Sequence, residues 1–225
     1  MSAYCVSGLD LARKVFNIVV AYYLDPNCAD ISKLRDLLKR HYEFFKYNKM
    51  LTTIAHIAHN CCASMDDLLI YRLKRYQIFY KELLRISKAL SREEIDYLVI
   101  KTVSPVPKDM ADIDLLIRYE DDLHFVRKVL LSIGYKPRKH GLEQDLFSKR
   151  VNSVCVDVEL HNRVAAAGYE YFSKELLFRR PRILDEEIRI PDPLNDVVLA
   201  AAHSVLKDLY VTLIDLIITY VVMRK

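Results

Sequence analysis

The first sixty residues show apolar positions that recur with the period of a helix. Apolar side chains return every three or four residues as far as Tyr23, and Asp25-Pro26-Asn27 then interrupts the pattern. A second helical pattern begins near Asp30, and a third, shorter one covers residues 50–62. We therefore expect a helical N-terminal segment whose apolar stripes need a partner to pack against.

The clearest helical pattern starts at Leu69 and ends at Leu90, with apolar residues spaced alternately by four and three. Beyond Glu94 the pattern changes to short apolar runs rich in strand-forming residues, at 97–100, 112–117, 146–150, 153–161 and 188–190. We expect further helices over 121–132, ended by Gly134, and over 163–180. The tail from residue 194 to 225 predicts two more helices.

This order of elements predicts an α+β fold, with a small mixed β-sheet flanked by N- and C-terminal helices. We expect three parts: a helical N-terminal segment over 1–62, an α+β core over 63–192, and a C-terminal helical pair over 193–225 packed on that core.

The composition narrows the possible classes. Of 225 residues, 52% are hydrophobic and 28% charged, which indicates a folded chain with a core. Four glycines are too few for a Rossmann fingerprint, a P-loop or a turn-rich all-β domain. Thirty-four basic residues against 30 acidic ones give a net charge of +4, which is too even to indicate nucleic-acid binding by itself.

Cysteines and the apolar tail bear on the compartment. The five cysteines are odd in number and show no CxxC spacing, which argues against a disulfide scaffold and favours a cytoplasmic location. No signal peptide is indicated at the N-terminus. The apolar run 209–223 is shorter than the roughly 20 residues that a bilayer needs, so we expect no membrane association.

The sharpest chemical feature is Asp112-Ile113-Asp114 on an expected strand. Side chains at i and i+2 share one face of a strand, so both carboxylates point the same way. A later strand places Asp157, Glu159 and His161 on one face by the same rule. If the two strands are neighbours, a third carboxylate lies about 5 Å away. Such a cluster can bind Mg²⁺ or Mn²⁺, and it suits in-line displacement at phosphorus. The alternative is a polar strand face without a ligand.

The chain resembles the nucleotidyltransferase superfamily built on the polymerase-β palm, and within it an uncharacterised bacterial and archaeal nucleotidyltransferase family. The resemblance covers roughly residues 66–222 and rests on these short motifs: Ile100-Lys101, Asp112-Ile113-Asp114-Leu115-Leu116, Gly134-Tyr135, Val158-Glu159-Leu160-His161, Ala202-His203 and Leu213-Ile214-Asp215-Leu216.

The resemblance implies a metal-dependent transfer of a nucleoside monophosphate from a nucleoside triphosphate to an acceptor hydroxyl. Asp112 and Asp114 would bind Mg²⁺ or Mn²⁺. Glu159 would be the third acid, as a metal ligand or as acceptor of the hydroxyl proton, with Asp157 as its rival. His161 would contact a phosphate or the acceptor, with an ordinary edge-strand histidine as the alternative.

One position departs from the superfamily pattern. A glycine is expected after Lys101, where backbone approaches the triphosphate, but the chain has the β-branched Thr102. Either Lys101 and the Thr102 hydroxyl replace some phosphate contacts, or triphosphate binding is weakened. Lys108 stands where the family often has an arginine ahead of the acidic pair.

Two further functions compete with the enzyme. Thr102 favours a catalytically degenerate binding or antitoxin-like module of the same fold. A helical interaction protein with merely solvated acids is the third hypothesis. The sequence leaves the acceptor open between protein, RNA and small molecule, and it does not fix the nucleotide or the oligomeric state. If the acids hold metal, we expect a variant with Asn at both Asp112 and Asp114 to fold at least as stably as the wild type without metal.

Weaker signals lie elsewhere. His56 and His59, followed by Cys61 and Cys62, offer metal-type ligands, but buried packing is the simpler explanation. Basic residues cluster near the acidic strands, where they could meet a triphosphate or a nucleic acid, or simply face solvent: Lys136, Arg138, Lys139, His140, Arg179, Arg180 and Arg182.

Overall fold

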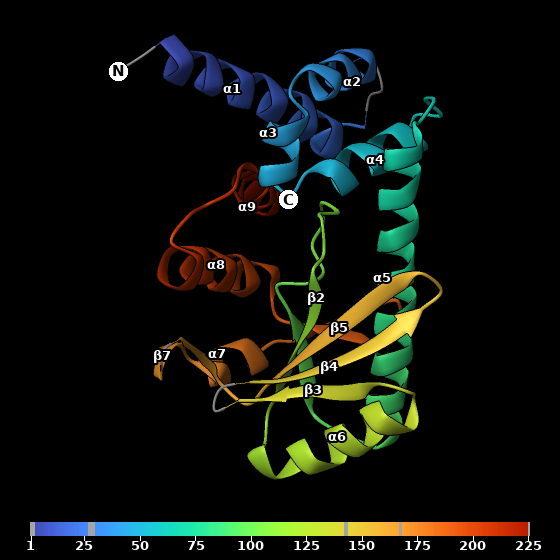
Figure 1. Cartoon of the computed structure of the whole chain (residues 1–225). Coiled ribbons are helices and arrows are strands. Elements are labelled where there is room, and N and C mark those ends of the chain that lie inside the picture. Colours follow the sequence, from blue (N-terminus) through green and yellow to red (C-terminus); the bar gives the residue numbers. More distant parts are fainter. Residues whose placement is uncertain (1–2, 27–29, 142–143, 167, 225) are drawn as a thin grey trace. The chain divides into compact units, whose positions relative to one another are not determined.

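The computed structural model describes residues 3–26, 30–141, 144–166 and 168–224 (Figure 1). The chain forms two compact units. The first contains Met1–Lys74, Ser104–Asp109 and Tyr210–Lys225, and the second contains Arg75–Val103 and Met110–Leu209. The division expected at residues 62 and 192, into an N-terminal helical segment, a core and a C-terminal helical pair, stays a prediction.

The first unit is helical. Its helices are α1 (Ala3–Leu24), α2 (Ile31–Arg40), α3 (Tyr42–Tyr47), α4 (Leu51–Asn60), the first two turns of α5 (Asp67–Arg92) and α9 (Leu213–Arg224). α1 packs on α9, where the rings of Phe16 and Tyr220 meet edge to face at 5.5 Å. The carboxylate of Asp109 accepts hydrogen bonds from the backbone N–H and the hydroxyl of Thr52, which satisfies the first turn of α4. No helix among the described residues is long and apolar enough to cross a membrane.

The cysteines differ in state. Cys61, which follows α4, is disulfide-bonded, whereas Cys62 and Cys155 are exposed free thiols. One disulfide does not make the small disulfide-rich scaffold that the sequence argued against. The cytoplasmic location stays a prediction.

The second unit is built on a five-stranded mixed sheet of order β1-β2-β5-β4-β3. The elements along this part of the chain are β1 (Tyr97–Ile100), β2 (Asp112–Ile117), a 3-10 turn (Glu120–Asp122), α6 (Leu123–Ser132), β3 (Lys136–His140), β4 (Gln144–Val151) and β5 (Val154–His161). β2 and β5 run parallel, and the other neighbours are antiparallel. The expected α+β class with flanking helices is confirmed.

The expected helix over 163–180 is wrong for most of its length. The chain instead forms the hairpin β6 (Val164–Ala166) and β7 (Tyr169–Phe172), then the short helix α7 (Lys174–Phe178). Gly168 adopts a φ of 85° ahead of β7, a conformation that suits glycine and a turn. Aromatic residues over 169–172 then favour a strand.

The remaining elements are β8 (Arg182–Leu184), β9 (Ile188–Ile190), α8 (Pro193–His203) and a π-helical turn (Ser204–Asp208). α8 begins with Asp192 as its N-cap, whose side chain accepts from the N–H of Leu194, and with Pro193 in the first turn. The expected pair of helices in the tail is present as α8 and α9.

The strands of the sheet have two different faces. On one face of β2, Ile113, Leu115 and Ile117 join a core with α5 and α6. On the other face, Leu116 packs in a second cluster that includes Leu199 of α8. Asp112 and Asp114 precede Leu116 on this second face, because side chains alternate along a strand. We call it the site face.

Candidate active site

The acidic residues of the sheet lie on two neighbouring parallel strands. β2 pairs with β5 so that Asp112 lies opposite Asp157 and Asp114 lies opposite Glu159. Directly opposed residues share a face of a sheet, so all four side chains lie on the site face. The sequence made this grouping conditional on the two strands being neighbours, and the structure meets that condition.

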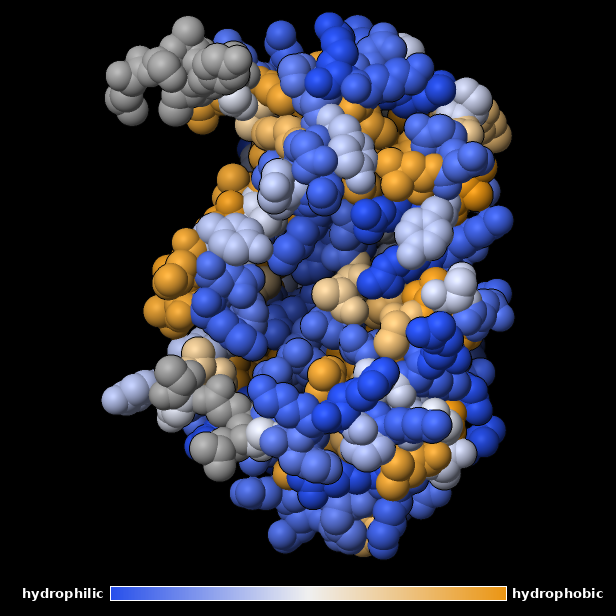
Figure 2. Space-filling view, viewed as in Figure 1, coloured by the Kyte–Doolittle hydropathy of each residue, from blue (hydrophilic) through white to orange (hydrophobic). Residues whose placement is uncertain are grey.

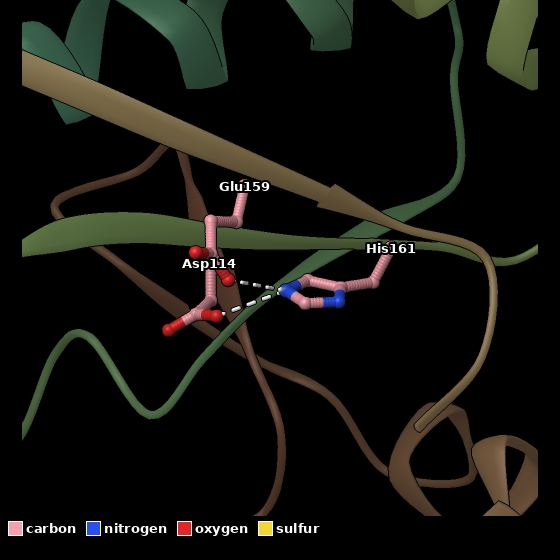
Figure 3. A group of neighbouring side chains, drawn as sticks. All are labelled: Asp114, Glu159 and His161. Carbon is pink, nitrogen blue, oxygen red and sulfur yellow. Dashed lines mark hydrogen bonds and ion pairs between the residues drawn. The ribbon is translucent and has the colours of Figure 1, made fainter. Parts of the chain in front are cut away.

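Three side chains of the site face converge, and we call Asp114, Glu159 and His161 the acid–histidine cluster. Their ligand-type atoms all lie within 4.8 Å of one another. Figure 3 shows the imidazole of His161 turned toward both carboxylates. Its Nε2 lies 2.9 Å from Oδ1 of Asp114 and 3.5 Å from Oε2 of Glu159. Asp114 and His161 are buried, and Glu159 is half-buried.

A lysine adds a second cation beside Asp114. Nζ of Lys101 lies 3.1 Å from Oδ1 of Asp114, and only 12% of the Lys101 side chain is exposed. Lys101 directly follows β1 with a left-handed φ of 55°. Its backbone N–H donates to Oδ1 of Asp196 in α8 at 3.0 Å. Asp196 therefore anchors the turn that brings the ammonium group to Asp114.

These contacts shift the pKa values of the two aspartates of β2 in opposite directions. Burial raises the pKa of Asp114, but the charge of Lys101 and the hydrogen bond from His161 outweigh it and hold this pKa well below its usual range. Burial, with the negative charges of Asp114 and Glu159, raises the pKa of Asp112 to about 6. Asp114 is thus a firmly held anion between Lys101 and His161, whereas repulsion and burial both disfavour charge on Asp112.

The donor set of the acid–histidine cluster fits a divalent metal ion. Two carboxylates and one imidazole supply oxygen and nitrogen ligands of the kind that such ions take. Burial lowers the pKa of His161, but its hydrogen bonds to Asp114 and Glu159 more than offset burial and raise this pKa overall. The two carboxylates therefore favour positive charge beside them, and a metal ion that bound Nε2 of His161 would have to displace a proton from it.

Residues 71–217 match the model of a protein family described as "Uncharacterised nucleotidyltransferase". The chain belongs to this family. The match includes β2, β5 and all of the acid–histidine cluster. Among solved structures, one of ANT(2")-Ia in complex with adenylyl-2"-tobramycin is similar, with a TM-score of 0.45 and 10% identity. The similarity covers 67% of this chain and 88% of that one. No protein with a curated description matches the chain.

The chain departs from the expected pattern at Thr102, and the structure shows what this residue contacts instead. The Thr102 hydroxyl donates to the carbonyl of Ile100 at 3.1 Å and accepts the N–H of Asp114 at 3.0 Å. The backbone N–H of Thr102 also donates to Ile100, and that of Lys101 is held by Asp196. Both backbone donors that would approach a triphosphate in the superfamily are therefore engaged within this chain.

Two other acids of the site face lie outside the cluster of possible ligands that the described residues form. Asp157 accepts a hydrogen bond from the hydroxyl of Ser148 in β4, which turns its carboxylate toward that strand. Asp112 lies two residues before Asp114 on the same face of β2 and is half-buried. The structure thus brings Glu159 and His161 to Asp114, with Asp112 beside them.

Lys108 lies in the segment Ser104–Asp109, which belongs to the first unit, whereas the acid–histidine cluster belongs to the second. Its expected contact with the nucleotide stays a prediction. His56 lies in α4 and stacks on the ring of Tyr23, with ring centroids 6.4 Å apart, as packed histidines do. Among described residues, His56 and His59 are not part of a metal-type cluster.

Sequence patterns hardly indicate the residues that α8 and the following turn bring near the cluster. His203, known beforehand only from a two-residue resemblance, lies 2.9 Å through Nδ1 from the Tyr171 hydroxyl and 3.6 Å through Nε2 from Asp208. Burial, with the charges of Lys101 and Lys207, lowers the pKa of His203 to about 4. The charge of Lys207 also helps to lower the pKa of Glu159, behind the larger effect of its hydrogen bond with His161. No local pattern predicts these proximities, because they depend on how α8 packs.

Proposed function

We propose that the protein is a Mg²⁺- or Mn²⁺-dependent nucleotidyltransferase that moves a nucleoside monophosphate from a nucleoside triphosphate to an acceptor hydroxyl. The observation that carries the proposal is the parallel register of β2 and β5, which sets Asp114 beside Glu159 inside the matched family region. Paired carboxylates at such a spacing suit cations and in-line phosphoryl chemistry.

Asp112, Asp114 and Glu159 are the proposed metal ligands. A divalent cation held there would polarise the phosphate oxygens and neutralise charge as the transition state develops. Asp114 is held in its anionic form by Lys101 and His161, so it is ready to take a cation without losing a proton first. His161, whose pKa is raised by its hydrogen bonds to Asp114 and Glu159, faces the same space and is positioned to contact a phosphate oxygen.

In the reaction, the acceptor oxygen bonds to the α-phosphorus while the bond between that phosphorus and the bridging oxygen of pyrophosphate breaks. Pyrophosphate leaves with the bonding electrons, and the hydroxyl proton passes to a carboxylate. Glu159 is the proposed proton acceptor when it is not fully engaged by metal. Asp157 is the alternative, although its carboxylate already accepts a hydrogen bond from Ser148.

We propose that side chains hold the triphosphate. Because the N–H groups of Lys101 and Thr102 are engaged internally, the ammonium groups of Lys101 and Lys207 take the place of backbone donors. Thr102 then does not touch a phosphate. Its hydroxyl accepts the backbone N–H of Asp114 and so holds Asp114 in position.

One observation favours a second candidate, a nucleotidyltransferase-fold binding module without activity. Lys101 already neutralises Asp114, and the backbone donors at the phosphate position are used, so the cluster could be a stable polar network only. The two candidates differ in whether nucleotide label is transferred.

The test uses the purified chain, each of the four α-labelled ribonucleoside triphosphates and a cell extract, with Mg²⁺ or Mn²⁺. We expect one nucleotide to label an acceptor with release of pyrophosphate. Asp114→Asn should abolish transfer, and Asp121→Asn, which changes an exposed acid in the 3-10 turn, should retain it. Nucleotide binding without any transfer would support the binding module, and neither binding nor transfer would refute both candidates.

A further inference from the structure

The site face carries basic side chains on the side of the acids opposite Lys101. Residue pairing extends from Asp112 through Asp157 and Ser148 to Lys136, crossing β2, β5, β4 and β3. A parallel row runs from Asp114 through Glu159 and Leu146 to Lys139. Paired residues share a face, so both lysines start from the same face as the acids.

A β-bulge makes this arrangement possible. The register of β3 against β4 shifts between Pro137 and Lys139, so Arg138 is an extra residue on the edge strand. Without the bulge, Lys136 and Lys139 would lie on opposite faces, since they are three residues apart. Arg150, opposite Cys155, adds a third cation of this face. We call Lys136, Lys139 and Arg150 the basic strip.

The cations on the two faces of these strands are used differently. On the helix face, Arg127 and His140 pair with Asp145, and Lys149 pairs with Glu82. Within the described ranges, the members of the basic strip form no ion pair, and all are exposed. In Figure 2 hydrophilic side chains dominate the surface around the position of β3 and β4.

Protection of the sheet edge does not account for the whole strip. Charges on an edge strand discourage pairing with another chain, which explains β3 in part. Arg150 lies past Ser148, the last β4 residue that pairs with β3, so β4 is itself the edge there. Edge protection does not require the charges to share one face, whereas the bulge brings Lys139 to the site face. The strip ends about two strand spacings, or about 10 Å, from Glu159, within reach of a molecule bound at the cluster.

We infer that the basic strip binds phosphate groups of the acceptor, so that the acceptor is a phosphorylated molecule whose hydroxyl reaches the acid–histidine cluster. This inference rests on the proposed function and deepens it. The sheet order puts the acids between two cationic sides, with Lys101 beyond β2 and the strip beyond β5. One side serves the triphosphate and the other serves the acceptor.

The test measures binding without nucleotide or metal, so that it does not depend on catalysis. A fluorescein-labelled short single-stranded RNA is titrated with the full chain and followed by anisotropy, and glycerol phosphate is titrated separately by calorimetry. The strip variant is Lys136→Gln, Lys139→Gln and Arg150→Gln together. The matched control removes three exposed cations of α5, Lys81→Gln, Lys88→Gln and Arg92→Gln.

We expect the strip variant to bind RNA at least about tenfold more weakly. The slope of log K against log salt concentration should be smaller by about two, because three phosphate contacts are lost. The control variant should bind like the wild type. RNA binding that is selectively lost identifies a polynucleotide acceptor, and selective loss of glycerol phosphate binding identifies a small phosphorylated alcohol. Absence of both, or equal loss in both variants, overturns the inference.

The three single variants and a thermal melt keep the test decisive if the triple variant folds poorly, since each single exposed substitution should leave the melting temperature unchanged. Failure here is separate from failure of the proposed function. If label transfer from the nucleotide persists while the strip variant binds normally, the enzyme stands and the acceptor site lies elsewhere.

Discussion

Asp112 and Asp114 differ in what they contribute to the fold, although they lie two residues apart on one strand. Asp114 accepts from Lys101 and His161, whereas burial and repulsion from Asp114 and Glu159 act on Asp112. The equal treatment of both acids in the sequence-based expectation therefore needs correction. Replacing Asp114 leaves Lys101 and His161 buried without their anion, which the expectation of a stable double Asn variant did not include.

We predict that Asp112→Asn stabilises the metal-free protein by about 1 kcal/mol, because it removes a repelled charge. Asp114→Asn should destabilise it by about 3 kcal/mol, the usual cost of removing one partner of a buried ion pair. Chemical denaturation at neutral pH measures both. Equal effects of the two substitutions would show that Lys101 and His161 do not distinguish the aspartates.

A second prediction at this scale concerns His203. Its pKa is lowered to about 4 in the folded chain, against about 6.5 for an ordinary histidine. The unfolded chain therefore binds more protons between these values, so His203 costs stability as pH falls from about 6.5 to about 4, by up to about 3 kcal/mol. His203→Gln should lose less stability than the wild type between about pH 7 and about pH 5. Parallel pH curves for the two proteins would contradict the burial of a neutral His203.

The connection that follows β1 is the element where sequence and structure differ most usefully. Thr102 looked like a defect at a glycine position, yet its hydroxyl bridges the carbonyl of Ile100 and the N–H of Asp114. Thr102→Val keeps the shape and leaves the buried N–H of Asp114 without this acceptor. We expect a loss of about 1–3 kcal/mol in stability and weaker Mn²⁺ binding.

Thr102→Ser is the matched control, because it keeps the hydroxyl. It should lose less stability than Thr102→Val and retain metal affinity close to that of the wild type. If the two variants behave alike in both measurements, the hydroxyl is not what positions Asp114.

The elements that could be predicted are those with strong local periodicity. Alternation within 112–117 and 153–161 gave the two acidic strands and the faces of their side chains. Gly134-Tyr135 marked the end of α6, and the structure adds that the Tyr135 hydroxyl donates to the buried Glu82. β3 was not predicted, because a fully exposed basic strand has no apolar alternation to detect. Pairing with β4 alone decides its conformation.

At the scale of the whole molecule, the net charge does not reveal how the charged side chains are distributed over the surface. A total of +4 gave no reason to expect a charged surface, but pairing on the helix face uses up acids and leaves the basic strip unpaired among the described residues. The contact of Lys101 with Asp114 and the proximity of Lys207 to Glu159 were equally beyond the sequence. Such contacts arise between elements distant in the chain, and short motifs do not encode them.

The most direct test of the account is whether the acid–histidine cluster binds a divalent metal ion, and Mn²⁺ followed by electron paramagnetic resonance measures this. The account predicts saturable Mn²⁺ binding for which Mg²⁺ competes and which a nucleoside triphosphate strengthens. Asp114→Asn should remove this binding, and Asp121→Asn should preserve it. Mn²⁺ binding that is absent with nucleotide present, or unchanged in Asp114→Asn, would contradict the assignment of this cluster as the metal site.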